Sequence, residues 1–213
     1  MPPPQATGPL SEGDGLPKLG MEPIRRRQLI DATIAAIDEN GFADATVSRI
    51  SARAGVSTGV VHHYFRNKDD LLEATLRDLA NTLRREVVER LARARSPRER
   101  VLAIIDGNLA PSLFTRAGVT AWLAFWGEAP STPRLARVQS IIIRRLRGNL
   151  THALRPIVAP ERLAMTADGI GTMLDGLWLR AALTRGAITL EEARRLAHDY
   201  LDLCLTHRGN SAD

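Results

Sequence analysis

Apolar side chains recur at intervals of three and four residues along most of the chain. Between residues 24 and 40, Ile30, Ile34 and Ile37 fall on one helix face, and Asn40-Gly41 is a typical helix stop. Further helices are predicted at 46–54, 57–65, 68–93, 98–109, 115–128, 134–155, 161–184 and 190–205, separated mainly by proline and glycine, including Gly186. No useful length alternates with the two-residue period of a strand. The pattern therefore predicts an all-α fold.

The segment from Thr46 to Lys68 combines two short helices with a tight turn. Thr46 and Ser57 are good N-caps, and Gly55 permits the turn between the helices. Ile50 and Val56 are placed to pack these helices at a steep angle. The first residues of the second helix would then be free to enter a DNA major groove, as in a helix-turn-helix.

Several polar residues around this segment are candidate DNA contacts. Thr58, Gly59 and His62 are candidates for base edges. Phosphates are bound by hydroxyls, helix N-termini and cations. The candidate phosphate contacts are therefore Thr46, Ser57, His63, Tyr64 and Lys68. Arg25, Arg26 and Arg27 open the first helix, where positive charge is unfavourable without a negative partner, so we expect phosphate contact there. The alternative is a solvated charged helix end.

These residues resemble the TetR family of repressors. The family pattern of a threonine, Ile-Ala, Ala-Gly-Val-Ser, a glycine, an aromatic cluster ending in Phe, and a lysine followed by Leu-Leu is matched between Thr46 and Leu72. Ser51 stands where alanine is usual, and His62 stands where many members have a DNA-contacting tyrosine. The first departure leaves the fold unaffected, and the second bears on which DNA sequence is bound.

A closer resemblance, over most of residues 17–184, is to the choline-responsive repressors of glycine-betaine synthesis within this family. The matching segments are 17–21, 25–33, 57–66, 121–126 and 175–183. The resemblance implies repression of choline-to-glycine-betaine genes, with choline as the effector in a C-terminal pocket. It also implies that the last two helices pair with those of a second copy, which would set two recognition helices about 34–36 Å apart. Leu174, Leu177, Leu179, Ala181, Ala182 and Leu183 make this region apolar almost all round.

Aromatic residues are only 4% of the chain, yet all three tryptophans lie in its C-terminal part. Trp122, Phe125 and Trp126 share one helix face. A quaternary ammonium is held by aromatic faces, often with a carboxylate nearby. The candidate ligand-binding residues are Trp122, Phe125, Trp126, Trp178, Asp106, Asp175 and Tyr200. Ordinary core or dimer packing is the alternative for each aromatic residue.

Composition narrows the partners and the chemistry. The 213 residues, 44% hydrophobic, suffice for a normal core, and the net charge of +5 favours a polyanionic partner such as DNA. Neither a membrane-spanning run nor a signal peptide is evident, and the single cysteine, Cys204, fits a reducing compartment, so we expect a cytoplasmic protein. His62 and His63 lie on different helix faces without further ligands, so no metal site is expected. No phosphate loop or nucleophile motif indicates an enzyme, and no cofactor is expected.

Together these features predict a disordered proline- and glycine-rich leader at 1–20, a DNA-binding domain at 21–67, an effector-binding and dimerisation domain at 68–207, and a tail at 208–213. The expected partners are double-stranded operator DNA, a second copy of the chain and a small-molecule effector, without a membrane. Two alternatives remain open. One is a repressor of the same fold that responds to a different hydrophobic or cationic ligand, and the other is a DNA-organising or adaptor protein without an effector.

Overall fold

The computed structural model describes residues 21–184 and 188–206, and it is all-helical over those ranges. The predicted leader, the break at Gly186 and the tail lie outside the described residues. Within the described part of the chain no residue is in a strand, which confirms the fold class. The helices that the apolar pattern predicts are all present, and no end is shifted by more than three residues.

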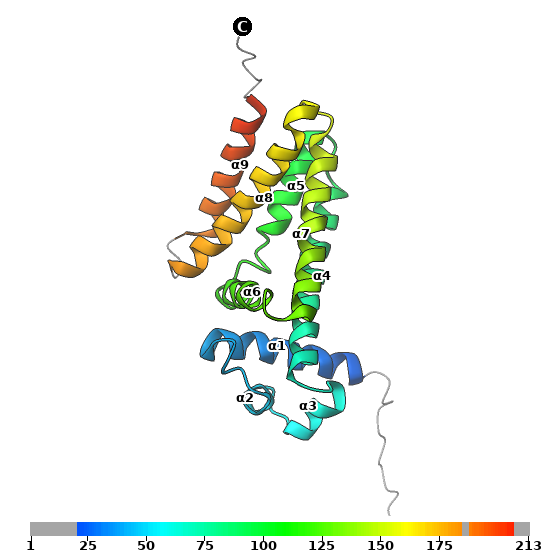
Figure 1. Cartoon of the computed structure of the whole chain (residues 1–213), viewed down its shortest axis with the longest axis vertical. Helices are drawn as coiled ribbons and strands as arrows, with labels where there is room; N and C mark the ends of the chain where they lie inside the picture. Colours follow the sequence, from blue (N-terminus) through cyan, green and yellow to red (C-terminus); the bar gives the residue numbers. More distant parts are fainter. Residues whose placement is uncertain (1–20, 185–187, 207–213) are drawn as a thin grey trace, which may run out of the picture.

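Three helices form one end of the molecule: α1 (Met21–Asn40), α2 (Val47–Arg53) and α3 (Thr58–Tyr64) (Figure 1). Thr46 and Ser57 accept hydrogen bonds from the third backbone N–H of the helix that each precedes, as expected of N-caps. Gly41 and Gly55 have φ angles of 79° and 65°, a left-handed conformation that favours glycine. The caps and glycines therefore fix the turns on both sides of α2.

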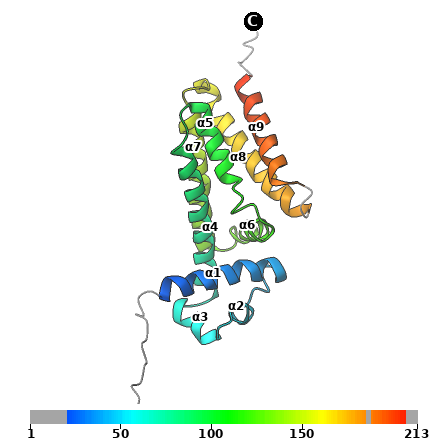
Figure 2. The same cartoon turned by 180° about the vertical axis from the view of Figure 1, so that it is seen from behind.

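The longer helices rise from this end along the rest of the molecule. They are α4 (Lys68–Leu91), α5 (Pro97–Asn108), α6 (Arg116–Glu128), α7 (Pro133–Leu154), α8 (Pro160–Leu183) and α9 (Leu190–Thr206). Figures 1 and 2 show α4 and α7 rising together from the three-helix end, with α8 and α9 along the opposite edge (Figure 2). α4 thus joins the three-helix unit to the remaining helices.

One continuous apolar core runs through both parts of the molecule. α4 and α5 approach closely at Gly107, where a Cβ atom would lie 2.7 Å from the Val87 Cα. α6 lies between the three-helix unit and the upper helices (Figure 1). On one side its Phe125 ring meets Phe42, and on the other Trp122 meets Trp178 of α8. A shift of α6 would therefore be felt in both parts of the molecule.

Candidate DNA interface and effector pocket

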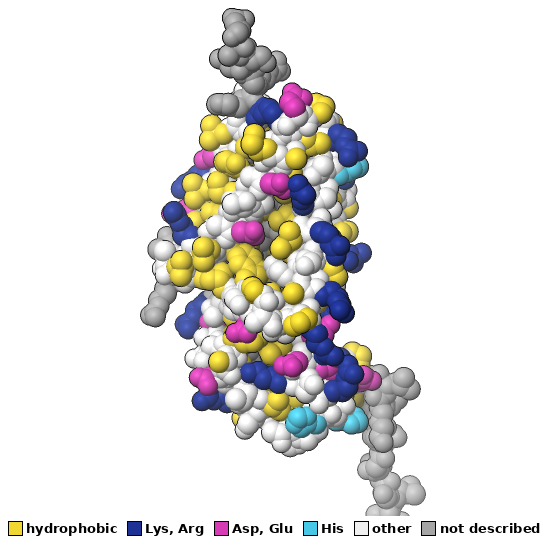
Figure 3. Space-filling model, in the orientation of Figure 1, with side chains coloured by type: hydrophobic (Ala, Val, Ile, Leu, Met, Phe, Trp, Pro, Cys, Tyr) yellow, Lys and Arg dark blue, Asp and Glu magenta, His cyan; other side chains and the backbone are white. Residues whose placement is uncertain are grey.

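The α2–α3 unit presents an exposed polar surface at the end of the molecule. Thr46, Ser57, Thr58, Gly59, His62 and His63 are all exposed. Beneath them Ile50 and Val61 are buried, so the unit is anchored by its apolar side. Figure 3 shows histidine side chains on this end of the surface (Figure 3). The residues predicted to face base edges therefore share one accessible face.

Several of the predicted phosphate contacts converge on a shallow depression in this face. It is lined by Arg25, Gly55, Val56, Ser57, Gly59, Val60, His63 and Tyr64. Arg25 brings a cation from α1, and its guanidinium donates to Gln28 Oε1 at 2.8 Å. His63 stacks edge-on against Tyr64, with ring centroids 4.9 Å apart. The arrangement places a cation, a hydroxyl and an imidazole on one surface, a combination suited to DNA phosphates.

Three other predicted phosphate contacts make contacts within the protein, and their role in DNA binding stays a prediction. Arg26 donates to the Tyr64 carbonyl oxygen at 2.9 Å and lies over the Phe65 ring. Arg27 pairs with Asp31 and Asp78, and these carboxylates raise its pKa against the opposing effect of burial. These carboxylates supply the negative charge that the sequence suggested DNA would supply.

The ammonium of Lys68 is the third of these groups. It donates to the carbonyl oxygens of Phe42 and Ala43 at 3.3 and 3.1 Å. It thereby ties the first turn of α4 to the turn between α1 and α2.

Within the described residues no group of three or more metal-ligating side chains occurs, at His62 and His63 or elsewhere.

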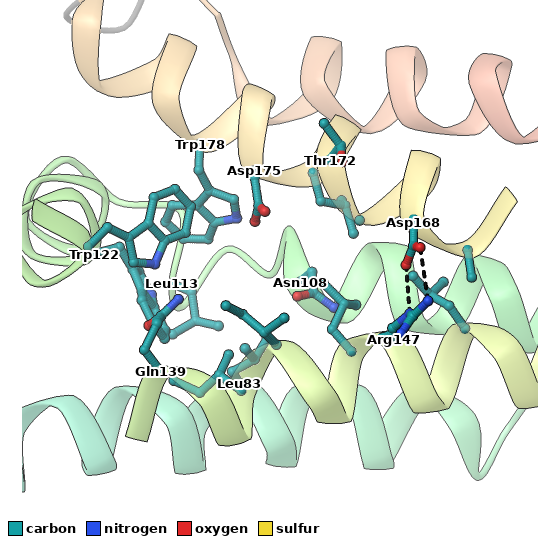
Figure 4. A pocket seen from close by; sticks show the side chains of 18 residues that line it. Leu83, Asn108, Leu113, Trp122, Gln139, Arg147, Asp168, Thr172, Asp175 and Trp178 are labelled. Atoms are coloured by element: carbon teal, nitrogen blue, oxygen red, sulfur yellow. Dashed lines mark hydrogen bonds and ion pairs between the residues drawn. The ribbon is translucent and has the colours of Figure 1, made fainter. Parts of the chain in front are cut away.

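A cavity of about 250 Å³ lies among α4, α5, α6, α7 and α8. Figure 4 shows Trp122 and Trp178 toward one end of it and the ion pair of Arg147 and Asp168 toward the other (Figure 4). Its wall is mainly apolar, and its aromatic and polar members are Asn108, Trp122, Trp126, Gln139, Arg147, Asp168, Thr172, Asp175 and Trp178. Three of the five predicted aromatic residues, all of them tryptophans, and one of the two predicted carboxylates therefore meet here.

The tryptophans form a contiguous aromatic wall. The Trp122 ring centroid lies 6.2 Å from that of Trp178 and 6.5 Å from that of Trp126. Trp178 is held from behind by Phe114, at 5.1 Å and in an edge-on orientation. Trp122 and Trp178 are buried in the protein, with only 4% and 6% of their surfaces exposed. Their rings are therefore fixed by packing before any ligand arrives.

Asp175 lies beside Trp178 in this wall (Figure 4). Among the described residues it makes no hydrogen bond or ion pair, whereas the neighbouring Asp168 is bound by Arg147 at 2.8 and 3.1 Å. Although Asp175 is an exposed residue, partial desolvation by its surroundings raises the pKa of its carboxyl. The cavity thus offers one uncompensated carboxylate beside aromatic faces.

Three buried polar atoms in the cavity wall also have no hydrogen-bond partner among the described residues: Trp122 Nε1, Trp126 Nε1 and Gln139 Oε1. The sequence analysis identified the two tryptophans but missed Gln139, Asn108 and Thr172. In the sequence Gln139 is marked only by its position, a polar residue directly after Val138, which is buried in α7. That signal is too weak to single it out.

Three predicted ligand-binding residues lie outside the cavity lining. Phe125 is fully buried and packs away from the cavity, with its ring centroid 5.5 Å from that of Phe42. Asp106 contacts His198 at 2.8 Å and Arg194 at 3.8 Å. Tyr200 packs so closely on Gly169 that a Cβ there would lie 2.6 Å from its hydroxyl. The sequence correctly placed Phe125 in a helix. It did not show that α6 is buried on two sides, and therefore not which neighbour Phe125 contacts.

Family models match most of the described helices. Residues 29–75 match the N-terminal domain of bacterial regulatory proteins of the tetR family, and residues 97–206 match the C-terminal domain of BetI-type transcriptional repressors. None of the described helices is long and apolar enough to cross a membrane. The predicted domain boundaries at 67/68 and 207/208 stay predictions.

Relatives with this organisation align over nearly their whole length. The chain is 48% identical to the HTH-type transcriptional regulator BetI 2 of Chromohalobacter salexigens, over 91% of this chain and 95% of that protein. It is 43% identical to BetI of Pectobacterium atrosepticum, over 90% of this chain and 100% of that protein.

Solved structures share the fold. A transcriptional regulator from Pseudomonas aeruginosa PAO1 is 28% identical, with a TM-score of 0.75 over 87% of this chain and 92% of that one. A regulator from Saccharomonospora viridis, crystallised in complex with choline, is 19% identical, with a TM-score of 0.75 over 84% of this chain and 96% of that one. The exposed helix-turn-helix, the all-helical fold and these matches together show that the chain belongs to the TetR family of DNA-binding transcriptional regulators, not enzymes, and carries a BetI-type repressor C-terminal domain.

Proposed function

We propose that this repressor controls the genes that convert choline to glycine betaine. Choline bound in the α4–α8 cavity would change its affinity for operator DNA. The observation that carries the proposal is Asp175, an unpaired carboxylate next to the faces of Trp178 and Trp122. A quaternary ammonium has no N–H to donate, so it is recognised by charge and by aromatic faces, each face contributing about 0.5–2 kcal/mol.

Charge in the cavity supports a cation in preference to an anion. The only cationic side chain in the described lining is Arg147, and Asp168 already neutralises it. Asp175 therefore sets the sign of the site. The choline complex of the S. viridis regulator adds support by analogy, since that protein shares the fold. The BetI-type match of residues 97–206 covers the elements that supply most of the wall.

α6 offers a physical route from the cavity to the DNA-binding unit. Trp122 and Trp126 line the cavity, while Thr120 on the same helix donates to Asp38 of α1 at 2.9 Å. A ligand that prefers one position of α6 would bias the position of α1 and hence of α3. A coupling of about 1–3 kcal/mol would change DNA affinity roughly 5- to 150-fold.

A homodimer completes the proposal. α8 and α9 lie at one edge of the molecule and expose apolar side chains that a monomer would leave in water, namely Met165, Leu179, Leu183, Leu196 and Leu203. Pairing of these helices with those of a second copy would cover the apolar edge and present two α3 helices to a palindromic operator. Such a regulator acts on DNA in the cytoplasm.

Fluorescence anisotropy of a labelled duplex from the upstream region of this gene tests the proposal. We expect binding that a scrambled duplex does not reproduce, and an affinity that changes when choline is added. The Asp175→Asn variant should bind the duplex but need roughly tenfold more choline for the same response. Specific binding that ignores choline in the unmodified protein would refute the effector assignment.

The second candidate is a repressor of the same family that responds to another hydrophobic or cationic ligand. The aliphatic part of the cavity favours it, since Leu83, Ile142, Ile143, Leu146 and Leu150 offer no polar contact. A panel of apolar cations in the same assay separates the two candidates. A response to a larger apolar cation, with none to choline, would select the second.

A further inference from the structure

A cleft on the α4–α7 edge of the molecule lies against the α4–α8 cavity. Its volume is about 60 Å³, and its apolar floor is formed by Ala80, Leu83, Val87, Val88, Ile142 and Leu146. The rest of its described lining is polar, and consists of Arg84 of α4, Asn108 of α5, and Arg145 and Asn149 of α7. One wall separates the two spaces, because the cavity is also lined by Leu83, Asn108, Ile142 and Leu146.

The positive charge of this cleft has no counter-charge within the described part of the chain. Arg84 and Arg145 make no hydrogen bond or ion pair there, and no carboxylate is part of the described lining. α7 contains neither Asp nor Glu between residues 133 and 154. On α4, Glu86 is the acidic residue closest in sequence to Arg84, but it is bound by Arg90 and Ser112. Figure 3 shows Lys and Arg side chains along the edge that α4 and α7 form.

The chemistry of the lining defines a ligand that would fit. Guanidinium groups on both walls of the cleft repel each other, and an anion between them would remove that repulsion. A guanidinium presents a planar fork of N–H donors that matches a carboxylate, and the amide of Asn149 adds a further donor. The apolar floor suits a short hydrocarbon tail, since about 60 Å³ holds roughly four to six non-hydrogen atoms.

We propose that the α4–α7 cleft is a second ligand site, which binds a small organic anion with its charged head between Arg84 and Arg145 and its tail on the apolar floor. The site has the opposite charge preference to the cavity that contains Asp175, so one ligand does not serve both. The proposal does not depend on choline binding, because none of the charged groups of the cleft belongs to the lining of the cavity.

Methyl NMR spectra of the full chain test the proposal with butyrate as the probe. Butyrate joins a carboxylate to a short tail, butyramide has the same shape without the charge, and inorganic phosphate has the charge without the tail. We expect saturable shifts of the Val87 and Val88 methyl signals with butyrate, and much weaker binding of the other two compounds. The indole N–H signals of Trp122 and Trp126 report on the cavity and should stay in place.

Two pairs of neighbouring arginines assign the binding to the cleft. Arg84→Gln and Arg145→Gln should each weaken butyrate binding roughly fivefold, the effect of one lost charge pair at an accessible site. Arg85→Gln and Arg144→Gln are the matched controls, because they remove the same charge one position away from the cleft. Each of these two side chains donates a hydrogen bond within its own helix, and neither lines the cleft. The controls should leave butyrate affinity unchanged.

Several outcomes would overturn the anion site. They are the absence of saturable butyrate shifts, equal binding of butyramide, and equal weakening by the cleft substitutions and their controls, which would reduce the effect to net charge. Butyrate shifts at the Trp122 and Trp126 indoles with none at Val87 and Val88 would place the anion in the cavity and would also refute the proposal. Choline binding is measured separately by the anisotropy assay, so the two proposals can fail independently.

Discussion

At the scale of single residues, the Asp175 carboxyl should lower the stability of the ligand-free protein while favouring the binding of a cation. Desolvation raises the pKa of its carboxyl in the folded protein. A carboxyl whose folded pKa lies above its unfolded value favours folding at low pH, and this contribution is lost as the pH rises through the folded pKa. At neutral pH the ionised group therefore costs stability, a cost that a bound cation would offset.

Asp175→Asn should accordingly raise the Tm of the ligand-free protein at neutral pH while weakening choline binding by roughly tenfold, about 1.4 kcal/mol. In the unmodified protein choline affinity should fall as the pH is lowered through the raised pKa of Asp175, and in the variant it should stay flat. Thermal melts and calorimetric titrations across pH measure both effects. A parallel pH profile in the two proteins would assign the site to other groups.

Neither the backbone conformation nor the packing of α3 requires a glycine at position 59. Its φ angle is ordinary, and an added Cβ would meet only Ser57 Oγ, at a comfortable 3.7 Å. Glycine in a helix costs about 1 kcal/mol relative to alanine. Gly59→Ala should therefore keep or raise stability yet weaken operator binding, because the methyl group would stand where DNA approaches. Unchanged anisotropy titrations in the variant would remove Gly59 from the predicted interface.

At the scale of elements, α6 connects the cavity to α1. The Thr120 hydroxyl donates to Asp38 on α1, Arg116 lies 3.4 Å from the same carboxylate, and Phe125 packs on Phe42. The Lys68 ammonium lies over the Phe42 ring and donates to the Phe42 carbonyl oxygen, in the turn that follows α1. These contacts form a continuous connection from the ligand wall to the first turn of α4.

Thr120→Val should weaken this connection without touching the cavity. We expect a stability loss of about 1 kcal/mol for the lost hydrogen bond, an unchanged choline affinity, and a ratio of DNA affinities with and without choline closer to one. Ser140→Ala is the control, because its hydroxyl donates only to Ala136 within α7. Anisotropy with saturating choline measures the ratio, and a full response in Thr120→Val would place the coupling elsewhere.

At the scale of the whole molecule, α8 and α9 form an edge that exposes several large apolar side chains. Leu183 and Leu203 are 71% and 63% exposed. Both helices are nevertheless anchored to the core by buried residues such as Leu174 and Leu201. The edge is therefore available to a second copy without any change in the helices themselves.

Leu183→Asp should shift sedimentation toward the monomer and reduce operator affinity, because charge would be buried in the dimer but solvated in the monomer. Val88→Asp provides the comparison: Val88 is 52% exposed on α4, away from α8 and α9. It should leave both the sedimentation and the DNA affinity unchanged. Equal effects of the two substitutions would argue against this edge as the dimer interface.

The sequence by itself determined the helices, the turns between α1 and α3, and the family. Apolar spacing of 3.6 residues, the caps at Thr46 and Ser57 and the glycines at 41 and 55 are local properties, so they are legible without tertiary contacts. The same spacing placed Trp122, Phe125 and Trp126 on neighbouring positions of one helix. Trp178 and Asp175 became candidates through the rarity of aromatic residues and the resemblance to choline-responsive repressors.

Only the tertiary structure decided which of these side chains meet. α6 is covered on two sides, so Phe125 faces α1 while Trp122 and Trp126 face the cavity, and helical spacing cannot divide residues between two buried faces. Partner choice is equally non-local: Asp106 is bound to His198 of α9, Arg27 to Asp78 of α4, and Asp175 to none of the described residues. Charge and hydrogen bonding depend on neighbours far apart in the chain, and for that reason Gln139 became visible only as an unpaired oxygen in a folded wall.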